Sequence, residues 1–441
     1  MEKQPLLSWL AGIALLLHQP TTIAGDQSIV RLMARFETEA NFDDKAGGKA
    51  NADDPAIWAH PDRSAESFVI GTLKEGGLTV FDLHGKTLQR VATPIAPNPG
   101  DKPGRFNNVD ILPQFELNGR IVDLAIVTDR GSDKLRIYRI NPGYKHRGTQ
   151  PLTDITSPHV PWVFSQSQHE VNQQQTAYGL ATGWLQGQPI AIASQRNQSR
   201  LAKLVLIALP DDTVSYRLHE RILLPGRFTL PDHHTWSPCL GNDGESAQIE
   251  GMVLDSQQGM LYAAQETVGI WGIPLKHVGK PTLLDKVKTF GVPYDRIWDT
   301  EEEEYNCTYR LDQDRGFGGH HLAADVEGLT LLRQQHDDDT YLLASSQGDS
   351  SFMAYRIKDS GNLKAKGRFT ITDGHRSDSV QRCDGAAVST AALGLDFPDG
   401  LLVVHDGDNT PVVLNDKGKP RENTNFKLLP IQQLTDALNL D

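Results

Sequence analysis

The 441-residue sequence predicts an all-β fold, a six-bladed β-propeller with four- to five-stranded antiparallel blades. Paired runs of alternating polar and apolar residues recur six times along the chain, and a shorter apolar segment that opens with polar residues precedes each pair. No long stretch shows the 3.6-residue period of helices that would cross over a parallel sheet. Repetition of a strand unit without crossover helices is typical of a propeller.

Each paired run is expected to form two antiparallel strands, because Gly, Asp, Asn and Ser stand at its break. The runs are SFVIGTLKEGGLTVFDL from residue 67, IVDLAIVTDRGSDKLRIYRI from 121, PIAIASQRNQSRLAKLVLIAL from 189, GMLYAAQETVGIWGIPL from 259, TYLLASSQGDSSFMAYRI from 340 and GLLVVHDGDNTPVVL from 400. Turn sequences such as DLHGK at 82 and KDSGN at 358 suit a reversal into a further strand. Uneven spacing predicts long loops around 143–176, 225–247 and 276–320.

The segments that precede the runs are expected to be the innermost strands. They are ADDPAIWAH at 52, NNVDIL at 107, AYGLATGW at 177, IEGMVLD at 249, VEGLTLL at 326 and CDGAAVS at 383. Inner strands surround the propeller axis, so polar residues at their matching ends should converge. This convergence gathers Asp53, Asp54, Asn108, Asp110, Tyr178, Glu250, Asp325, Glu327 and Asp384. We expect the two ends of the chain to close the ring together.

A cluster of carboxylates in a partly desolvated channel requires positive charge. Calcium accepts six to eight oxygen ligands in loose geometry, whereas zinc and copper favour the His and Cys that these segments lack. The alternative is that the acids make turn hydrogen bonds or hold one structural ion. Lys74, Arg130 and Arg196 follow the second strand of blades one to three. Cations beside a calcium cluster favour a phosphorylated ligand.

The composition narrows the class of partner. The formal net charge is −13, and Lys and Arg form no cluster of the kind that binds a nucleic-acid backbone. Residues 1–25 are typical of an export signal, with Lys3 ahead of an apolar run too short to span a bilayer. We therefore expect residues 26–441 to form a single propeller domain, secreted or periplasmic, monomeric, and without membrane or nucleic-acid partners.

Cysteines, paired histidines and one acidic run have simple interpretations. Cys239, Cys307 and Cys383 allow one disulfide and a free thiol, and the sequence does not select the pair. The adjacent pairs at 233–234 and 320–321 lack the spacing of helical metal sites and predict loop histidines. The run DTEEEEYN at 299–306 predicts a solvated acidic loop, with a calcium role as the alternative.

Longer motifs span nearly all of the chain after residue 50. They are ADDPAIW at 52, GGLTVFDLHGK at 76, GRFNNVDI at 104, VDLAIVTDR at 122, YGL at 178, IEGMV at 249, GMLYAAQETVGIW at 259, HLAADVEGLT at 321, YLLASSQGDSS at 341 and NTNFK at 423. In these motifs and in their order along the chain, the sequence resembles the β-propeller phytases, also called alkaline phytases. The resemblance implies hydrolysis of phosphomonoesters of calcium-bound myo-inositol hexakisphosphate (phytate) by metal-activated water, with several calcium ions, a neighbouring subsite for a second phosphate and no phosphoenzyme.

The resemblance also implies roles for particular residues. Those that would hold calcium are Asp54, Asp110, Glu250, Glu266, Asp325, Glu327 and Gln347, with Asp53 and Asp384 from the convergence described above. Glu37, Asp378, Asp406 and Asn409 would belong to structural calcium sites. The catalytic set is Glu250, Tyr178, Asp325 and Glu327, and the substrate-binding set is Lys74, Arg130, Asn108 and Arg196.

Three departures from the family pattern bear on substrate affinity. The family has two lysines where this chain has Lys74 and Glu75, and a lysine of blade three is replaced at Gln195 or Arg196. The last inner segment has VQRC where further acids are usual. Because the water-binding acids are intact, we expect activity with weaker or altered substrate affinity. The alternatives are a propeller hydrolase of another class, such as a lactonase, and a non-catalytic propeller that binds phosphorylated ligands.

Overall fold

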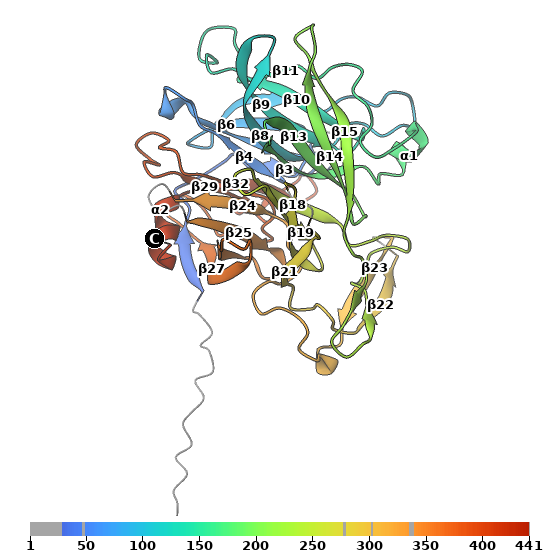
Figure 1. The fold of residues 1–441 in the computed structure, drawn as a ribbon. Helices are drawn as coiled ribbons and strands as arrows, with labels where there is room; N and C mark the ends of the chain where they lie inside the picture. Colours follow the sequence, from blue (N-terminus) through green and yellow to red (C-terminus); the bar gives the residue numbers. More distant parts are fainter. Residues whose placement is uncertain (1–28, 46–48, 277–278, 301–302, 335–338, 441) are drawn as a thin grey trace, which may run out of the picture.

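A computed structural model describes residues 29–45, 49–276, 279–300, 303–334 and 339–440 (Figure 1). The predicted export signal lies outside these residues. Six antiparallel sheets follow one another along the chain. Their innermost strands contact one another in a closed cycle, from β4 through β8, β12, β18, β24 and β28 back to β4. This closed cycle confirms the six-bladed propeller.

Each blade consists of strands paired in sequence order from the axis outward. Blade one is β4 (Pro55–Trp58), β5 (Phe68–Thr72), β6 (Leu78–Asp82) and β7 (Thr87–Val91); blade two is β8 (Phe106–Leu117), β9 (Arg120–Asp129), β10 (Lys134–Ile140) and β11 (Leu152–Asp154); blade three is β12 (Ala177–Leu185), β13 (Gln188–Gln195), β14 (Arg200–Ala208) and β15 (Val214–Leu223). Blade four is β18 (Ile249–Asp255), β19 (Met260–Gln265), β20 (Gly269–Pro274) and β21 (Thr282–Lys286); blade five is β24 (Leu329–Arg333), β25 (Thr340–Ser346), β26 (Ser351–Ile357) and β27 (Leu363–Thr372); blade six is β28 (Ala386–Ser389), β29 (Leu401–Asp406) and β32 (Asn423–Pro430).

The N-terminal segment completes the last two blades. β1 (Val30–Met33) lies parallel to β27, β2 (Phe36–Glu37) pairs antiparallel with β32, and β3 (Asn41–Phe42) also pairs with β32. The C-terminal helix α2 (Ile431–Leu438) packs its apolar side chains into the core shared by blades five and six. Closure by the two ends of the chain is therefore confirmed, with strands from both ends in blade six.

The blades adhere through their apolar faces. Phe68 and Ile70 of blade one lie in the same fully buried cluster as Val127 of blade two. Burying a side chain of this size stabilises the fold by about 1.5–3 kcal/mol. The second strands β5 and β25 are buried at every position, because each is covered on both faces by neighbouring blades. Continuous burial explains why these strands are rich in apolar residues.

Short elements occupy the regions predicted to be long loops. They are α1 (Gln168–Asn172), β16 (Phe228–Thr229), β17 (Thr235–Trp236), β22 (Tyr294–Asp299), β23 (Glu304–Tyr309) and the 3₁₀ turn Leu311–Gln313. Elsewhere lie the 3₁₀ turns Ser64–Glu66 and Gln347–Asp349 and the short strands β30 (Val413–Leu414) and β31 (Pro420–Arg421). The prediction that the run from residue 400 forms one hairpin is wrong, because β29 pairs with β28 and β32, whereas β30 pairs with β31. No helix among the described residues has the length and apolarity needed to cross a bilayer.

The prediction of a loop over the acidic run at 299–306 is wrong in part. β22 and β23 form a hairpin that projects from the propeller, and Asp299 and Glu304–Asn306 of the run belong to its strands (Figure 1). Trp298 and Tyr305 face each other across the strands with ring centroids 5.0 Å apart. A disulfide between Cys239 and Cys307 ties the hairpin to the loop before blade four, and Cys383 is buried and free. Tyr305, Cys307 and Tyr309 alternate with polar residues along β23 and are its less exposed positions, so the period of a strand was present in the sequence.

Candidate metal and phosphate site

Glycines in the inner segments allow neighbouring blades to meet closely at the axis. A Cβ added to Gly251 would lie 1.7 Å from the backbone oxygen of Glu327, and one added to Gly328 would lie 2.4 Å from that of Asp384. Real Cβ atoms do not approach so closely, so these positions require glycine. The repeated pairing of an acidic residue with a glycine therefore has one explanation. The glycine of one blade leaves room for the backbone of the acidic residue of the next blade.

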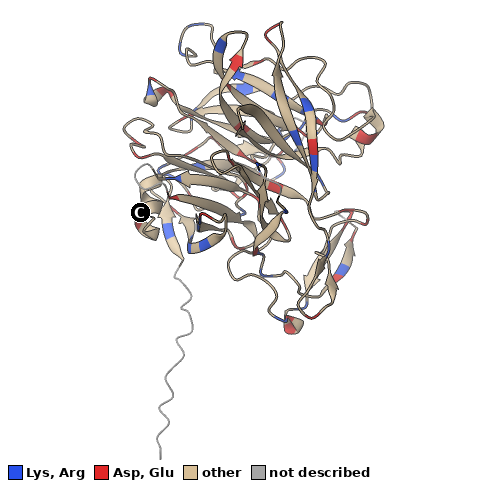
Figure 2. Cartoon of the chain, in the orientation of Figure 1, with Lys and Arg blue, Asp and Glu red and all other residues tan. Residues whose placement is uncertain are grey.

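This packing collects buried carboxylates from blades one, four, five and six. Ligand oxygens of Asp53, Glu250 and Asp384 lie within 4.8 Å of one another, and so do those of Glu250, Glu266 and Glu327. All five side chains are buried. We call these five residues the acid ring. In contrast to the acid ring, the outer strands β14 and β15 together carry both basic and acidic residues (Figure 2).

Burial and mutual repulsion oppose ionisation of four members of the acid ring. Burial raises the pKa of Glu250 to about 7, and the Asp53 carboxylate adds to the effect. Burial likewise holds the pKa values of Glu266, Glu327 and Asp384 well above the usual range, because each also faces other carboxylates. The ring is fully ionised at neutral pH only if cations lie among its oxygens.

Glu250 is held at the centre of this arrangement by two neutral side chains. The Tyr178 hydroxyl donates to Glu250 Oε2 at 2.6 Å, and Asn107 Nδ2 donates to Oε1 at 2.6 Å. Arg130 Nη1 donates to Asn107 Oδ1 at 3.0 Å, and its guanidinium lies 5.4 Å from the centre of the Tyr178 ring. Burial raises the pKa of Tyr178 well above its usual value, so its hydroxyl remains a donor.

Cations border the acid ring on one side. Lys74 Nζ lies 3.1 Å from Asp53 Oδ1. Burial acts to lower the pKa of Lys74, but the carboxylates of Asp53 and Asp384 outweigh it and the pKa is raised. Burial lowers the pKa of Arg130 to about 10, and the positive charge of Arg196 contributes. The charge of Arg196 also lowers the pKa of Glu266, so Arg196 is near both Arg130 and the acid ring.

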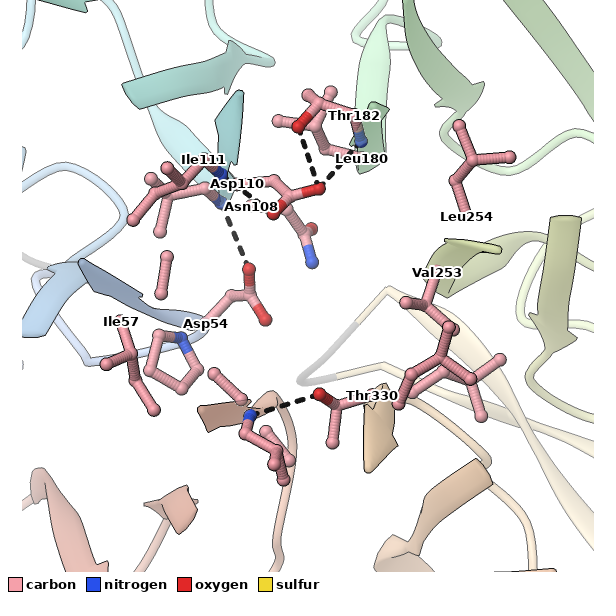
Figure 3. A pocket seen from close by; sticks show the side chains of 18 of the residues that line it. Asp54, Ile57, Asn108, Asp110, Ile111, Leu180, Thr182, Val253, Leu254 and Thr330 are labelled. Carbon is pink, nitrogen blue, oxygen red and sulfur yellow. Dashed lines mark hydrogen bonds between the residues drawn. The ribbon is translucent and has the colours of Figure 1, made fainter. Parts of the chain in front are cut away.

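Asp54 and Asp110 line a cavity at the axis beside the acid ring, and the charges of Asp53 and Glu250 add to the effect of burial in raising the pKa of Asp54. Both belong to the wall of a cavity of about 440 Å³, together with Asn108 (Figure 3). Asp54 Oδ2 accepts from the backbone N–H of Val109 at 3.0 Å. Asp110 Oδ2 accepts from the backbone N–H of Thr182 at 2.6 Å and from its hydroxyl at 3.0 Å. Burial raises the pKa of Asp110 to about 6. These two acids therefore form a second group of candidate ligands along the axis.

The side chains of the acid ring suit a hard cation. All candidate donors in it are carboxylate oxygens, which calcium prefers. The buried atoms Asp53 Oδ2 and Glu266 Oε1 have no hydrogen-bond partner among the described residues. Buried charged oxygens left without donors are costly unless a cation meets them. The donor set and these orphaned oxygens fit bound calcium.

The four residues assigned to structural calcium sites surround a lysine. Lys427 Nζ lies 2.6 Å from Glu37 Oε2, 3.1 Å from Asp406 Oδ2 and 3.0 Å from Asn409 Oδ1, and it also contacts Asp378. The Lys427 side chain is fully buried. Its ammonium therefore supplies positive charge to this cluster, and a calcium role for these residues stays a prediction.

Other predicted site residues take distinct places. Asp325 lies near the acid ring, where it acts electrostatically on Glu266, and burial raises its pKa to about 6. Gln347 Nε2 donates to Glu327 Oε2. Gln195 Nε2 donates to the backbone oxygen of Gln175 at 2.8 Å. Of the two residues considered as replacements for the lysine of blade three, only Arg196 carries a positive charge.

Sequence reasoning missed two residues of the site. Asn107, and not its predicted neighbour Asn108, contacts both Glu250 and Arg130. Gln248 Nε2 donates to Glu266 Oε2 at 2.9 Å and to the Tyr178 hydroxyl at 3.3 Å. The motif GRFNNVDI contains Asn107, and Gln248 stands two residues before Glu250. Both residues carry amide side chains and stand at or just before the start of an inner segment, which is the sequence feature that could have identified them.

The fold and the site together define the class of protein. It is a closed β-propeller with buried carboxylates near its axis and cations beside them. The family model for phytase matches residues 3–187 and 294–441, and the chain therefore belongs to the phytase family.

Particular relatives extend this comparison. The chain is 28% identical over 451 aligned residues to a 3-phytase of Bacillus subtilis (strain 168), with 99% of this chain and 94% of that protein covered. Among solved structures, a protein from Lactobacillus plantarum is 14% identical, with 68% and 67% of the two chains covered and a TM-score of 0.36. A β-propeller domain from Myceliophteria thermophila is 10% identical, with 85% and 83% covered and a TM-score of 0.35.

Proposed function

We propose that the protein is a calcium-dependent phosphatase that hydrolyses phosphomonoesters of phytate. The observation that carries the proposal is the buried acid ring bordered by Lys74, Arg130 and Arg196. The carboxylates would bind calcium ions, and the neighbouring basic side chains would bind phosphate oxygens. Both would be satisfied by a phosphorylated ligand that binds together with calcium. Membership of the phytase family and the similarity to a 3-phytase support the same substrate class.

Calcium, when bound, would neutralise phosphate charge and activate the attacking water. The residues proposed to hold it are Asp53, Asp54, Asp110, Glu250, Glu266, Asp325, Glu327, Gln347 and Asp384. Lys74, Arg130, Arg196 and Asn108 are proposed to take phosphate oxygens. Charge-assisted hydrogen bonds of this kind are about twice as strong as neutral ones.

Glu250 is proposed as the main catalytic carboxylate. Tyr178 and Asn107 fix both of its oxygens, so its orientation is set before substrate arrives. The same Asn107 fixes Arg130, and the carboxylate and the guanidinium are thereby held relative to each other. Such fixed geometry suits a water on one side and a phosphate on the other. Asp325 and Glu327 complete the proposed catalytic set.

The cellular location and assembly remain part of this proposal. We propose that residues 1–25 direct export, that the mature chain is a secreted or periplasmic monomer, and that its partner is a small phosphorylated molecule. The apolar run in residues 6–17 supports export.

The test is phosphate release from phytate after chelator treatment, with and without added calcium. We expect release only with calcium. Parallel assays with a lactone and with a phosphodiester establish the reaction class, and circular dichroism verifies that the chelated protein stays folded. Folded protein that releases no phosphate at any calcium concentration would overturn the proposal.

A further inference from the structure

Gln248 stands just before the inner strand of blade four, and its side-chain amide makes three hydrogen bonds. Its Nε2 group donates to Glu266 Oε2 at 2.9 Å and to the Tyr178 hydroxyl at 3.3 Å. Its Oε1 atom accepts from the backbone N–H of Asn197 at 2.9 Å. An amide has two donors at one end and an acceptor at the other, so only one orientation of this side chain satisfies all three partners.

The amide of Gln248 decides which oxygen of Glu266 is left for a cation. The backbone N–H of Glu266 donates to the carbonyl of Gln248 at 3.1 Å, so the two residues are bound through both backbone and side chain. Gln248 takes Oε2, whereas the buried Oε1 has no hydrogen-bond partner among the described residues. Glu266 shares its part of the acid ring with Glu250 and Glu327. One oxygen of Glu266 therefore has a neutral donor, and the other can face a cation held by the ring.

The same amide acts on Glu250 through Tyr178. The Tyr178 hydroxyl accepts from Gln248 and donates to Glu250 Oε2 at 2.6 Å. A hydroxyl has a single hydrogen, so accepting from Gln248 directs that hydrogen to Glu250. Each donor in such a chain polarises the next and strengthens its bond. Gln248 thus helps to orient Glu250 without touching it.

The turn between β13 and β14 anchors the amide at its other end. Asn197 has a positive φ of 56°, a conformation that asparagine tolerates better than most residues. Its Nδ2 donates to Glu245 Oε1 at 2.6 Å, and its carbonyl accepts from the N–H of Ser246 at 2.9 Å. These bonds fasten the turn that follows Arg196 to the segment before β18. Its N–H is therefore a fixed donor, and it holds Gln248 Oε1 in place.

We propose that Gln248 is a positioning residue, anchored on Asn197, which holds Glu266 and Tyr178 in the orientations that calcium binding and catalysis need. This inference rests on the proposed function. Orientation matters because a displacement of about 1 Å in a catalytic group can cost on the order of 100-fold in rate. A hydrogen bond to a charged group is worth about 10- to 100-fold in affinity. The defect expected on loss of Gln248 lies in kcat and in calcium affinity.

The experiment compares Gln248→Met with wild type. Methionine has a similar length but makes none of the three hydrogen bonds. Calcium binding is measured by calorimetry without substrate, and kcat and KM for phytate are measured per folded molecule, with circular dichroism and urea unfolding to verify the fold. We expect calcium affinity to fall about 10-fold and kcat to fall about 10- to 100-fold.

KM for phytate should change by about twofold or less, because the turn after Arg196 keeps its bonds to Glu245 and Ser246. Gln248→Asn keeps the amide on a shorter side chain, where water can bridge the gap, so it should lose less. It replaces Gln248→Met in every measurement if the methionine variant does not fold.

A double-mutant cycle identifies the route of the effect. Glu266→Gln removes the charge that Gln248 orients. In that background Gln248→Met should change calcium affinity by about twofold or less. Gln258→Met is the matched control, because Gln258 is exposed in the turn after β18, at the end of that strand away from Glu250. It should leave calcium binding and turnover unaffected.

The outcomes separate the two proposals. A variant with normal kcat and normal calcium affinity per folded molecule overturns the inference even if it is less stable, because the role of Gln248 would then be structural. An equal loss of calcium affinity in the Glu266→Gln background also overturns it. Wild type that binds calcium but releases no phosphate refutes the proposed function, while a calcium defect that disappears in that background still supports this inference. Wild type that binds no calcium overturns both.

Discussion

Replacing Glu250 by Gln should stabilise the calcium-free protein above pH 7 while abolishing phosphatase activity. Glu250 is buried among carboxylates, which raises its pKa from 4.5 to about 7. A carboxyl with a raised folded pKa favours the folded state while it is protonated and penalises it once ionised. Removing its charge therefore removes a penalty.

The size of the effect follows from this pKa. At about 1.4 kcal/mol for each pH unit, ionised Glu250 destabilises the calcium-free fold by about 3 kcal/mol above pH 7. The penalty declines as pH falls from 7 to 4.5 and is absent below 4.5, where the carboxyl is protonated in both states. The variant and wild type should then be equally stable.

The substitution preserves the local hydrogen bonds. The amide oxygen of Gln can accept from Asn107, and its NH₂ group can donate to the Tyr178 oxygen, which now acts as acceptor. The variant loses an anionic ligand without a change in shape. Calcium should consequently stabilise wild type more than the variant, and the order of stabilities should narrow or reverse when calcium is added.

The assay is urea unfolding in chelator at pH 4.5, 6, 7 and 8, repeated with calcium, and phosphate release is measured in parallel. Glu116→Gln is the control, because Glu116 is exposed on β8 and its replacement should show no such pH dependence. The reasoning is refuted if Glu250→Gln is less stable than wild type in chelator at pH 8, or if the difference is the same at every pH. Near-normal turnover would refute the catalytic role.

Three further predictions concern charge. Glu75→Gln should lower KM for phytate about two- to fivefold at low ionic strength, since a negative charge near phosphate is lost while the amide still accepts from Arg105; a KM unaffected at any salt concentration would contradict this. Calcium binding should release protons and weaken as pH falls from 8 to 6, because calcium displaces protons from Glu250 and from Asp325, with pKa values of about 7 and about 6; calorimetry in buffers of different ionisation enthalpy measures the release, and its absence would be contrary evidence. Lys427→Met should destabilise the chelated protein by about 3–5 kcal/mol, because three carboxylates lose their buried cation; unfolding by urea tests this, and unchanged stability would show that the ammonium is not needed.

Local patterns in the sequence predicted the six blades and the location of the site. Strand alternation and polar turns act between near neighbours, so five of the six predicted hairpins were recognised. The sixth was wrong, because β29 pairs with β32, beyond the run from residue 400. The repeated acid and glycine steps also marked the inner ends of the blades. Their packing now explains the repeat, since Gly251 and Gly328 accommodate the backbone of Glu327 and Asp384.

Only the tertiary structure decided which polar residues share a site. Asp53 and Asp54 are adjacent, yet one joins the acid ring and the other faces the channel, because successive residues of an extended chain point in opposite directions. From the sequence alone, Glu75 appears only as a carboxylate where the family has a lysine. The structure shows that Arg105, at the start of blade two, forms an ion pair with it. The sequence determines the repeating unit through local periodicity, whereas pairs of charges from different blades depend on how the ring closes, which no local pattern encodes.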